Sequence, residues 1–420
     1  MRTVLLLLPL LLCLPAKPGL AARKGHLAII GGALAPDNAG VYTEIIRRGK
    51  GKDKCRVVIL AAASATPVRS GNAYREDFIR FGVAPDRVRS LELALLNDPG
   101  TPEFDESKWS INHSDSRLVS QIDQADIAFM AGGDQSRYTQ LLLTPAGGDT
   151  PLLQALRRLL KRGGIIAGTS AGAAVMSDPM ITGGDSQDSL LAPDPPGSGS
   201  PVTIARGLGF WPRGLVDQHF LRRGRWGRLV SALMQSKRNC LGLGVGENTA
   251  AFIAANKLTV IGSGAVVVID RTAVKSFSRS PWHVKGLILH YLQDGDRIDL
   301  NRLQVHANPR RKRRAVSGIG DSQPQRTPMA GAFFDYGLSR LLIEQLVEPG
   351  CSRARALAWD DRQSGVVKGI EAVARITPQT RIFQDRGNGR PTWTLQHIGL
   401  DLLPITITIQ RSRNENGEEK

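Results

Sequence analysis

Short apolar runs alternate with amphipathic charged segments from His26 to Gly246. The runs are rich in aliphatic and β-branched residues, which is typical of buried strands. The segments between them place apolar residues at helical spacing. This alternation predicts a parallel sheet covered by helices on both faces. The expected strands lie at 26–30, 56–60, 88–96, 126–130, 164–167, 210–216 and 241–246, and the expected helices at 41–50, 74–81 and 152–161.

The pattern changes after residue 250. Short runs at 251–254, 258–261 and 265–270 predict hairpins, and 287–294 is expected to close the domain. The basic, polar stretch that follows predicts an exposed linker, and apolar periodicity then resumes with a helix at 336–348 and strands at 356–359, 372–376 and 402–409. The expected divisions are a catalytic domain (23–305), a linker (306–328) containing Arg310–Arg314, a small C-terminal α/β appendix (329–410) and a charged tail (411–420).

Three glycine-rich turns follow expected strands. They are Gly31-Gly32, Gly132-Gly133 and the turn that contains Ser170. In parallel sheets, ligands gather at the carboxyl ends of the strands. Ser170 lies in a Gly-x-Ser-x-Gly pattern between an expected strand and a helix, where a serine is held with its hydroxyl exposed beside free backbone N–H groups. Alone, this pattern also fits a tightly packed turn.

The N-terminus predicts secretion. Arg2 precedes an apolar run from Val4 to Leu14, and Pro15 and small residues follow it, as in a secretory signal peptide that ends near Ala22. The run is too short to span a bilayer. We therefore expect residues 1–22 to be removed and the mature protein to have no membrane anchor.

The 420 residues carry a net charge of +17, which favours contact with anionic polymers or surfaces. No zinc-finger spacing or base-stacking motif is present, so the charge does not indicate nucleic-acid binding. The cysteines show no metal-ligand spacing, and we expect neither a metal nor an organic cofactor. Residues 183–199 lack an apolar pattern and are expected to form a surface insertion or a flap.

A catalytic serine requires a base and an acid that orients the base. His219 follows an expected strand, and Glu247 follows the next strong one, so both are expected at the same sheet edge as Ser170. The chain order Ser–His–Glu differs from the order in α/β-hydrolases.

Four motifs in one order resemble the cyanophycinase family, serine exopeptidases related to aspartyl dipeptidase (peptidase E). They are Gly168–Ala173, Ala131–Gln135, Asp217–Leu229 and Gly246–Ala250. The resemblance covers about Leu27 to Leu300 and is to the extracellular type. It implies a flavodoxin-like or class I glutamine-amidotransferase-like fold with a doubly wound, mostly parallel sheet. Gly246 departs from the family, which usually has an acidic residue there.

The resemblance implies a role for each matching residue. Ser170 would attack cyanophycin, a poly-aspartate chain that carries arginine on each β-carboxyl, with His219 as base and Glu247 as its orienting acid. Ala171, Gly132 and Gly133 would supply the oxyanion hole. The implied product is the β-Asp-Arg dipeptide, and relatives of this fold often form homodimers. The residues implied to contact substrate are Gln135, Asp217, Gln218, Arg223, Arg225 and Arg228.

Two alternatives remain open. One is a peptidase for other aspartyl or isoaspartyl peptides. The other is a catalytically silent binder of anionic polymer, which would not need Ser170, His219 and Glu247 together. A glutamine-amidotransferase activity is disfavoured because that chemistry uses a cysteine where Ser170 stands.

Overall fold

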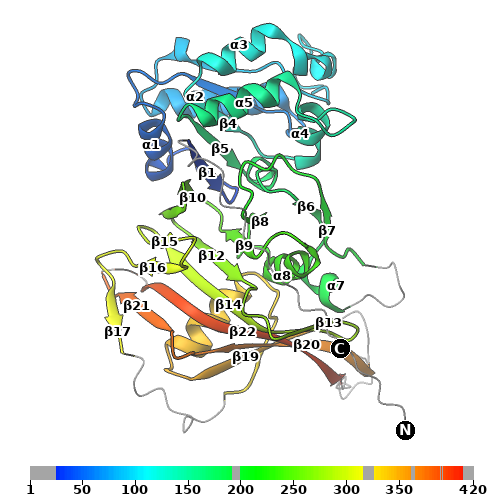
Figure 1. Ribbon diagram of the computed structural model, residues 1–420, viewed down its shortest axis with the longest axis vertical. Coiled ribbons are helices and arrows are strands. Elements are labelled where there is room, and N and C mark those ends of the chain that lie inside the picture. Colours follow the sequence, from blue (N-terminus) through cyan, green and yellow to red (C-terminus); the bar gives the residue numbers. More distant parts are fainter. Residues whose placement is uncertain are drawn as a thin grey trace, which may run out of the picture.

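The computed structural model describes residues 25–191, 199–315, 326–360, 365–387, 389 and 391–409. The predicted signal peptide and the charged tail lie outside these residues, as does part of the predicted insertion. The described residues form two large β-sheets and one small two-stranded sheet (Figure 1). Among the described residues, no helix is both long and apolar enough to cross a membrane.

The first sheet has nine strands in the order β16-β15-β11-β10-β1-β5-β4-β2-β3. Five of these strands are parallel. If β2, β3, β4 and β5 are numbered 1 to 4, their order across the sheet is 2-1-3-4, as in flavodoxin-like folds. The expected parallel sheet is therefore confirmed. The parallel strands are β1 (His26–Ile30), β2 (Val57–Leu60), β3 (Val88–Ser90), β4 (Ile127–Met130) and β5 (Ile165–Thr169). The antiparallel strands are β10 (Thr249–Ala254), β11 (Lys257–Gly262), β15 (Arg297–Asp299) and β16 (Gln304–His306).

Helices cover both faces of this sheet because its side chains alternate in direction. Ala28 and Ile30 pack with α1 and α2, whereas Leu27 and Ile29 belong to the core shared with α3 and α5. The covering helices are α1 (Ala39–Arg48), α2 (Pro67–Arg80), α3 (Ser116–Gln124), α4 (Gln135–Leu142) and α5 (Pro151–Lys161), with 3-10 turns at Pro85–Arg87 and Glu106–Ser114.

The second sheet contains the strands that lead to His219 and Glu247. Its order is β18-β19-β20-β22-β14-β12-β9-β8, with β13 beside β14 and β21 joining β17 to β22. The expectation that one sheet carries all the site residues was therefore wrong. β8 pairs with β9, and β9 pairs with β12, so neither strand pairs with β1 or β5. The strands are β8 (Gly214–Asp217), β9 (Leu241–Val245), β12 (Ala265–Asp270), β13 (Ser276–Arg279), β14 (Trp282–Gln293), β17 (Lys312–Arg314), β18 (Met329–Ala330), β19 (Arg353–Trp359), β20 (Gly365–Arg375), β21 (Arg381–Asp385) and β22 (Thr392–Ile409).

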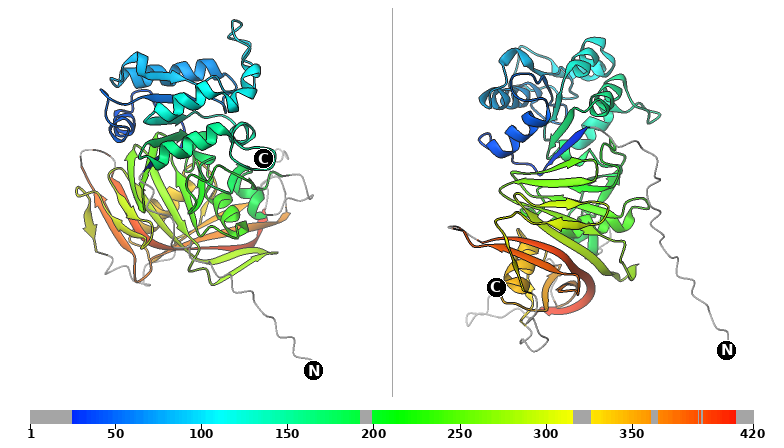
Figure 2. Two further views of the ribbon diagram at one scale, coloured as in Figure 1. Left: turned by 45° about the horizontal axis from the view of Figure 1, so that its top comes forward. Right: turned by 60° about the vertical axis from the view of Figure 1, so that its left-hand side comes forward.

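The C-terminal region continues the second sheet instead of forming a separate appendix. β22 pairs with β14, and the orange and red C-terminal strands lie beside the yellow-green strands (Figure 2). Ile398 and Leu400 of β22 join the core that contains Leu287 and Leu289. Without β22, β14 would present an open, apolar edge. The expected helix forms as a short α9 (Gly337–Ser339) that continues as a π-helix over Arg340–Val347 and packs on this sheet.

The predicted linker is partly buried. The Arg311 guanidinium donates from Nη1 to Asp296 Oδ1 at 2.6 Å and from Nε to the Thr392 hydroxyl at 3.1 Å. The Thr394 hydroxyl donates to the other oxygen of Asp296 at 2.7 Å. The ion pair is almost fully buried, with side-chain exposures of 3% and 0%. It fastens the segment after β16 and the start of β22 to one carboxylate, so Arg311 is structural and not an exposed linker residue.

We predict that Arg311→Ala lowers the free energy of unfolding by about 3–5 kcal/mol, because it leaves the Asp296 carboxylate buried without its cation. The measurement is denaturant unfolding followed by fluorescence. Arg310→Ala is the matched control, since Arg310 is exposed. Equal stability of the two variants would contradict the assignment.

Candidate active site

Ser170 sits on a strained turn between β5 and α6 (Ala171–Ala174). Its backbone has φ 51° and ψ −112°, outside the regions that non-glycine residues usually occupy. The flanking glycines allow this turn because they are in close contact with backbone. A Cβ on Gly168 would lie 2.2 Å from the Gly172 carbonyl oxygen, and one on Gly172 would lie 2.2 Å from that of Met130. This is the geometry of a nucleophile elbow.

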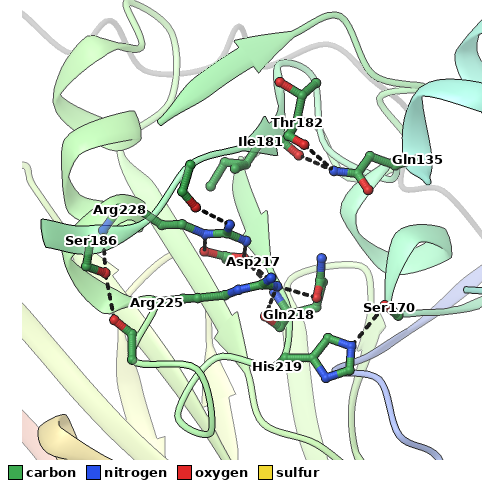
Figure 3. Close-up of polar contacts among 12 residues, drawn as sticks. Gln135, Ser170, Ile181, Thr182, Ser186, Asp217, Gln218, His219, Arg225 and Arg228 are labelled. Atoms are coloured by element: carbon green, nitrogen blue, oxygen red, sulfur yellow. Dashed lines mark hydrogen bonds and ion pairs between the residues drawn. The ribbon is translucent and has the colours of Figure 1, made fainter. Parts of the chain in front are cut away.

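His219 and Glu247 complete a hydrogen-bonded chain with Ser170. The Ser170 hydroxyl lies 3.0 Å from His219 Nε2, and His219 Nδ1 lies 2.5 Å from Glu247 Oε1 (Figure 3 shows the first contact). The three residues follow β5, β8 and β9, so the site forms where the two sheets meet. The arrangement is that of a nucleophile, a base and a group that orients the base.

The backbone of Ile30-Gly31-Gly32 holds these three positions together. Successive carbonyls of this segment accept N–H donors from Ser170 at 3.1 Å, His219 at 2.6 Å and Asn248 at 2.9 Å. Close approach requires the two glycines. A Cβ on Gly31 would lie 1.9 Å from the Gly246 oxygen, and one on Gly32, whose φ is +93°, would lie 2.3 Å from His219 Nε2. The sequence placed this pair at the strand ends where ligands gather, but it did not indicate that the pair holds the three site residues.

Burial lowers the pKa of His219 below its usual value of 6.5, although the hydrogen bond to Glu247 raises it. The positive charges of Arg223 and Arg225 lower this pKa further. The imidazole is therefore neutral at pH 7 and can accept a proton from the Ser170 hydroxyl.

The predicted oxyanion donors lie beside Ser170. A Cβ on Gly132 would lie 3.2 Å from the Ser170 Cβ, so the two residues are adjacent. Across the described ranges, no protein acceptor takes the N–H of Gly132, Gly133 or Ala171. These groups can therefore donate to an oxygen that develops negative charge next to Ser170.

Asp217 and Arg228 pair with each other. Arg228 donates from Nε and Nη2 to the two carboxylate oxygens of Asp217, at 2.8 and 2.6 Å, and from Nη1 to the Gly184 carbonyl at 2.7 Å. Figure 3 shows the two side chains facing each other. They are only 1% (Asp217) and 6% (Arg228) exposed. The implied role of Asp217 as a substrate contact does not fit this arrangement, because its carboxylate already binds Arg228.

Gln218, Arg225 and Gln135 are fixed by backbone groups. Arg225 Nη1 donates to the Gln218 carbonyl at 2.8 Å and to Gln218 Oε1 at 2.6 Å, and burial lowers the pKa of Arg225 to about 10. Gln135 Nε2 donates to the Ile181 carbonyl at 2.8 Å. It therefore anchors β6 (Met180–Gly183), which pairs with β7 (Thr203–Ala205).

Arg223 differs from Arg225 and Arg228 because its side chain is exposed. It has no ion-pair partner in the part of the chain that the structure describes. Its charge nevertheless acts on the pKa of His219, so it lies near the base. Of the predicted substrate residues, Arg223 is the cation best placed to meet a carboxylate of a ligand.

The predicted insertion contains a helix, α7 (Ser186–Leu191), which packs against α8 (Trp226–Gln235). The Ser186 hydroxyl donates to the Gly224 carbonyl at 2.6 Å and accepts from the Arg228 N–H at 3.1 Å. The expectation of a surface loop was therefore wrong for residues 186–191, whereas residues 192–198 lie outside the described part. Sequence reasoning missed Ser186 because no periodicity marks so short a helix.

No group of three or more His, Cys, Asp or Glu side chains that could hold a metal ion occurs among the described residues.

Comparison with known proteins points to one family. A profile of peptidase family S51 matches residues 103–261. The cyanophycinase of Synechococcus elongatus is 34% identical over 294 residues, which cover 68% of this chain and 82% of that protein. The Nostoc cyanophycinase is 32% identical over 68% of this chain and 88% of its own, and that of Geminocystis herdmanii is 31% identical over 66% and 94%. A solved peptidase from an acI-B1 Actinobacterium superposes with a TM-score of 0.43 at 20% identity, covering 59% of this chain and 91% of that one.

We predict that kcat/KM falls as the pH drops through the pKa of His219, below 6.5, and is level above it, because only the neutral imidazole is a base.

Glu247→Gln should lower kcat by about 10²–10⁴-fold, since the ring loses its orienting partner. The same change should move the acid limb to lower pH, because Glu247 raises the pKa of His219. A pH–rate profile of both proteins measures this, and an acid limb moved upward in the variant would contradict it.

We predict that Gly32→Ala reduces kcat by about 100-fold or more, because its Cβ would displace the His219 ring from Ser170. Gly51→Ala is the matched control. Gly51 also has a positive φ, of +81°, but no atom lies within 4 Å of the added Cβ. Steady-state kinetics and thermal unfolding of both variants separate backbone strain, common to both, from loss of the site. Equal activity of the two variants would count against the contact.

Proposed function

The chain belongs to peptidase family S51 together with the cyanophycinases, and on this premise we propose that it hydrolyses cyanophycin to β-Asp-Arg dipeptides through an acyl-enzyme on Ser170. As a member of the family it is a hydrolase that acts as a serine peptidase. The observation that carries the proposed mechanism is the unbroken contact chain Ser170–His219–Glu247.

Acylation begins when Ser170 Oγ attacks a backbone carbonyl carbon of the poly-aspartate chain. His219 Nε2 accepts the hydroxyl proton, and Glu247 holds the Nδ1–H and stabilises the imidazolium that forms. The carbonyl oxygen becomes negatively charged and receives hydrogen bonds from the N–H of Ala171 and of Gly132 or Gly133. Loss of one such donor typically costs about 10²–10³-fold in rate.

The tetrahedral intermediate collapses when the C–N bond breaks and His219 returns the proton to the leaving amine. Water then attacks the ester carbon of the acyl-enzyme while His219 takes one of its protons, and Ser170 leaves with that proton. The acid and base roles of His219 alternate, which requires a pKa not far from the working pH.

Recognition of the substrate rests on charge. Each cyanophycin unit carries a guanidinium, and each released dipeptide carries carboxylates. Arg223 is exposed beside the base and can bind a carboxylate bidentately. Arg225 and Gln218 hold each other next to it. The buried Asp217–Arg228 ion pair packs behind this turn and adds no net charge to the site.

The proposal includes secretion. Arg2, the apolar run to Leu14 and the small residues up to Ala22 form the pattern of a cleaved signal peptide. An enzyme outside the cell would meet the polymer as insoluble material, which agrees with an exopeptidase that works from chain ends.

The experiment compares the mature protein with its Ser170→Ala variant on insoluble cyanophycin granules. Only the wild type should release soluble dipeptide, and the variant should still bind the granules. Release by both would contradict Ser170 as nucleophile. If neither releases dipeptide, assays on short isoaspartyl peptides and salt-dependent binding to anionic polymer decide between the two alternative functions.

A further inference from the structure

Two large apolar side chains are exposed almost next to each other on the loop after β18. Phe334 is 59% exposed and Tyr336 is 47% exposed. They flank Asp335, whose carboxylate is 56% exposed. This loop lies outside the residues that the family profile matches. Exposed aromatic side chains on a well-anchored loop mark a binding surface more often than scattered surface residues do.

The loop is rigidly attached. The Trp226 indole N–H donates to the Ala332 carbonyl at 2.8 Å, and the Ala332 N–H donates to the Leu357 carbonyl at 3.0 Å. Phe333 packs on Trp226 with ring centroids 4.7 Å apart. A loop held by backbone, indole and ring contacts presents its outward side chains in one orientation.

The loop packs on the turn that carries the site residues. The Tyr336 N–H donates to the Leu221 carbonyl at 2.7 Å, and Arg222 forms an ion pair with Asp335. A Cβ on Gly224 would lie 1.8 Å from the Phe333 carbonyl oxygen. This turn begins at His219, whose carbonyl accepts the Arg223 N–H at 3.0 Å. The loop that carries the exposed rings therefore contacts the turn that carries Arg223.

The local chemistry suits a guanidinium. The Phe334 ring lies against Gly331, where a Cβ would come within 2.5 Å of it, so the ring is fixed while most of its surface stays open. Aromatic faces attract guanidinium groups, and the carboxylate between them supplies a hydrogen-bond acceptor. The Arg222–Asp335 pair is solvent-exposed, so little free energy is lost when a ligand arginine replaces Arg222.

We propose that Phe334, Asp335 and Tyr336 bind arginine side chains of the substrate chain beyond the units on either side of the scissile bond. This inference rests on the proposed function and extends it. The C-terminal region then contributes a subsite that lets the enzyme hold a long, arginine-bearing chain while Ser170 acts at its end.

The test compares a soluble chain of about ten β-Asp-Arg units with a two-unit substrate, which supplies only the groups beside the scissile bond. Phe334→Ala/Tyr336→Ala should raise KM for the long chain by about 5–20-fold and leave its kcat unchanged. KM and kcat for the two-unit substrate should stay within twofold of wild type. Phe334→Tyr/Tyr336→Phe, which keeps both rings, should behave as wild type. Phe104→Ala removes a similarly exposed ring, 44% exposed, outside this loop. It should change KM and kcat for neither substrate.

Each other result overturns the inference. An unchanged KM for the long chain means that the rings do not bind it. An equal loss on both substrates, with thermal unfolding unchanged, means that the loop only positions the turn at 219–225. If the wild type hydrolyses neither substrate, the proposed function fails, and the subsite fails with it.

Discussion

The active site depends on three consecutive backbone carbonyls. Those of Ile30, Gly31 and Gly32 accept hydrogen bonds from Ser170, His219 and Asn248, the last being the neighbour of Glu247. The bond from His219 crosses from one sheet to the other, because His219 follows β8. Backbone positions are set by the sheets and not by flexible side chains, so the serine, the base and the acid inherit their spacing from a single strand end. The Asn38 amide adds to this by donating to Asn248 Oδ1 at 2.7 Å.

Glycine is required at that strand end for a steric reason. Gly31 lies against the Gly246 carbonyl, and Gly32 lies against the imidazole of His219. The same close approach accounts for Gly246, because a side chain there would come within 2.9 Å of the Ala265 carbonyl oxygen. An acidic side chain at this position would need Ala265, the first residue of β12, to shift.

The parts that could be predicted from sequence are those with local signals. The parallel strands and their helices follow from apolar periodicity, and the elbow at Ser170 follows from small residues between a strand and a helix. Sheet membership could not be predicted in this way, because β8 and β9 are as apolar as β4 and β5, and only nonlocal pairing distinguishes them. The burial of Arg311 was equally hidden, because no local pattern marks its contacts with Asp296, 15 residues away, and Thr392, 81 residues away.

The roles of the charged residues at the site could be predicted only in part, for the same reason. Asp217, Arg223, Arg225 and Arg228 look alike in sequence as polar groups near a histidine. In the structure, Asp217 and Arg228 neutralise each other, Arg225 is held by Gln218, and Arg223 alone among the three arginines points its charge to solvent. Burying one pair has a functional consequence. It fixes the 217–228 segment without leaving the Asp217 carboxylate free to repel an anionic group, and the exposed Arg223 adds positive charge near the base. The neutral state of His219 depends on burial and on the positive charge nearby, since Arg223 and Arg225 both lower its pKa. Arg223, the group available to hold a carboxylate, thus also helps to keep the base unprotonated.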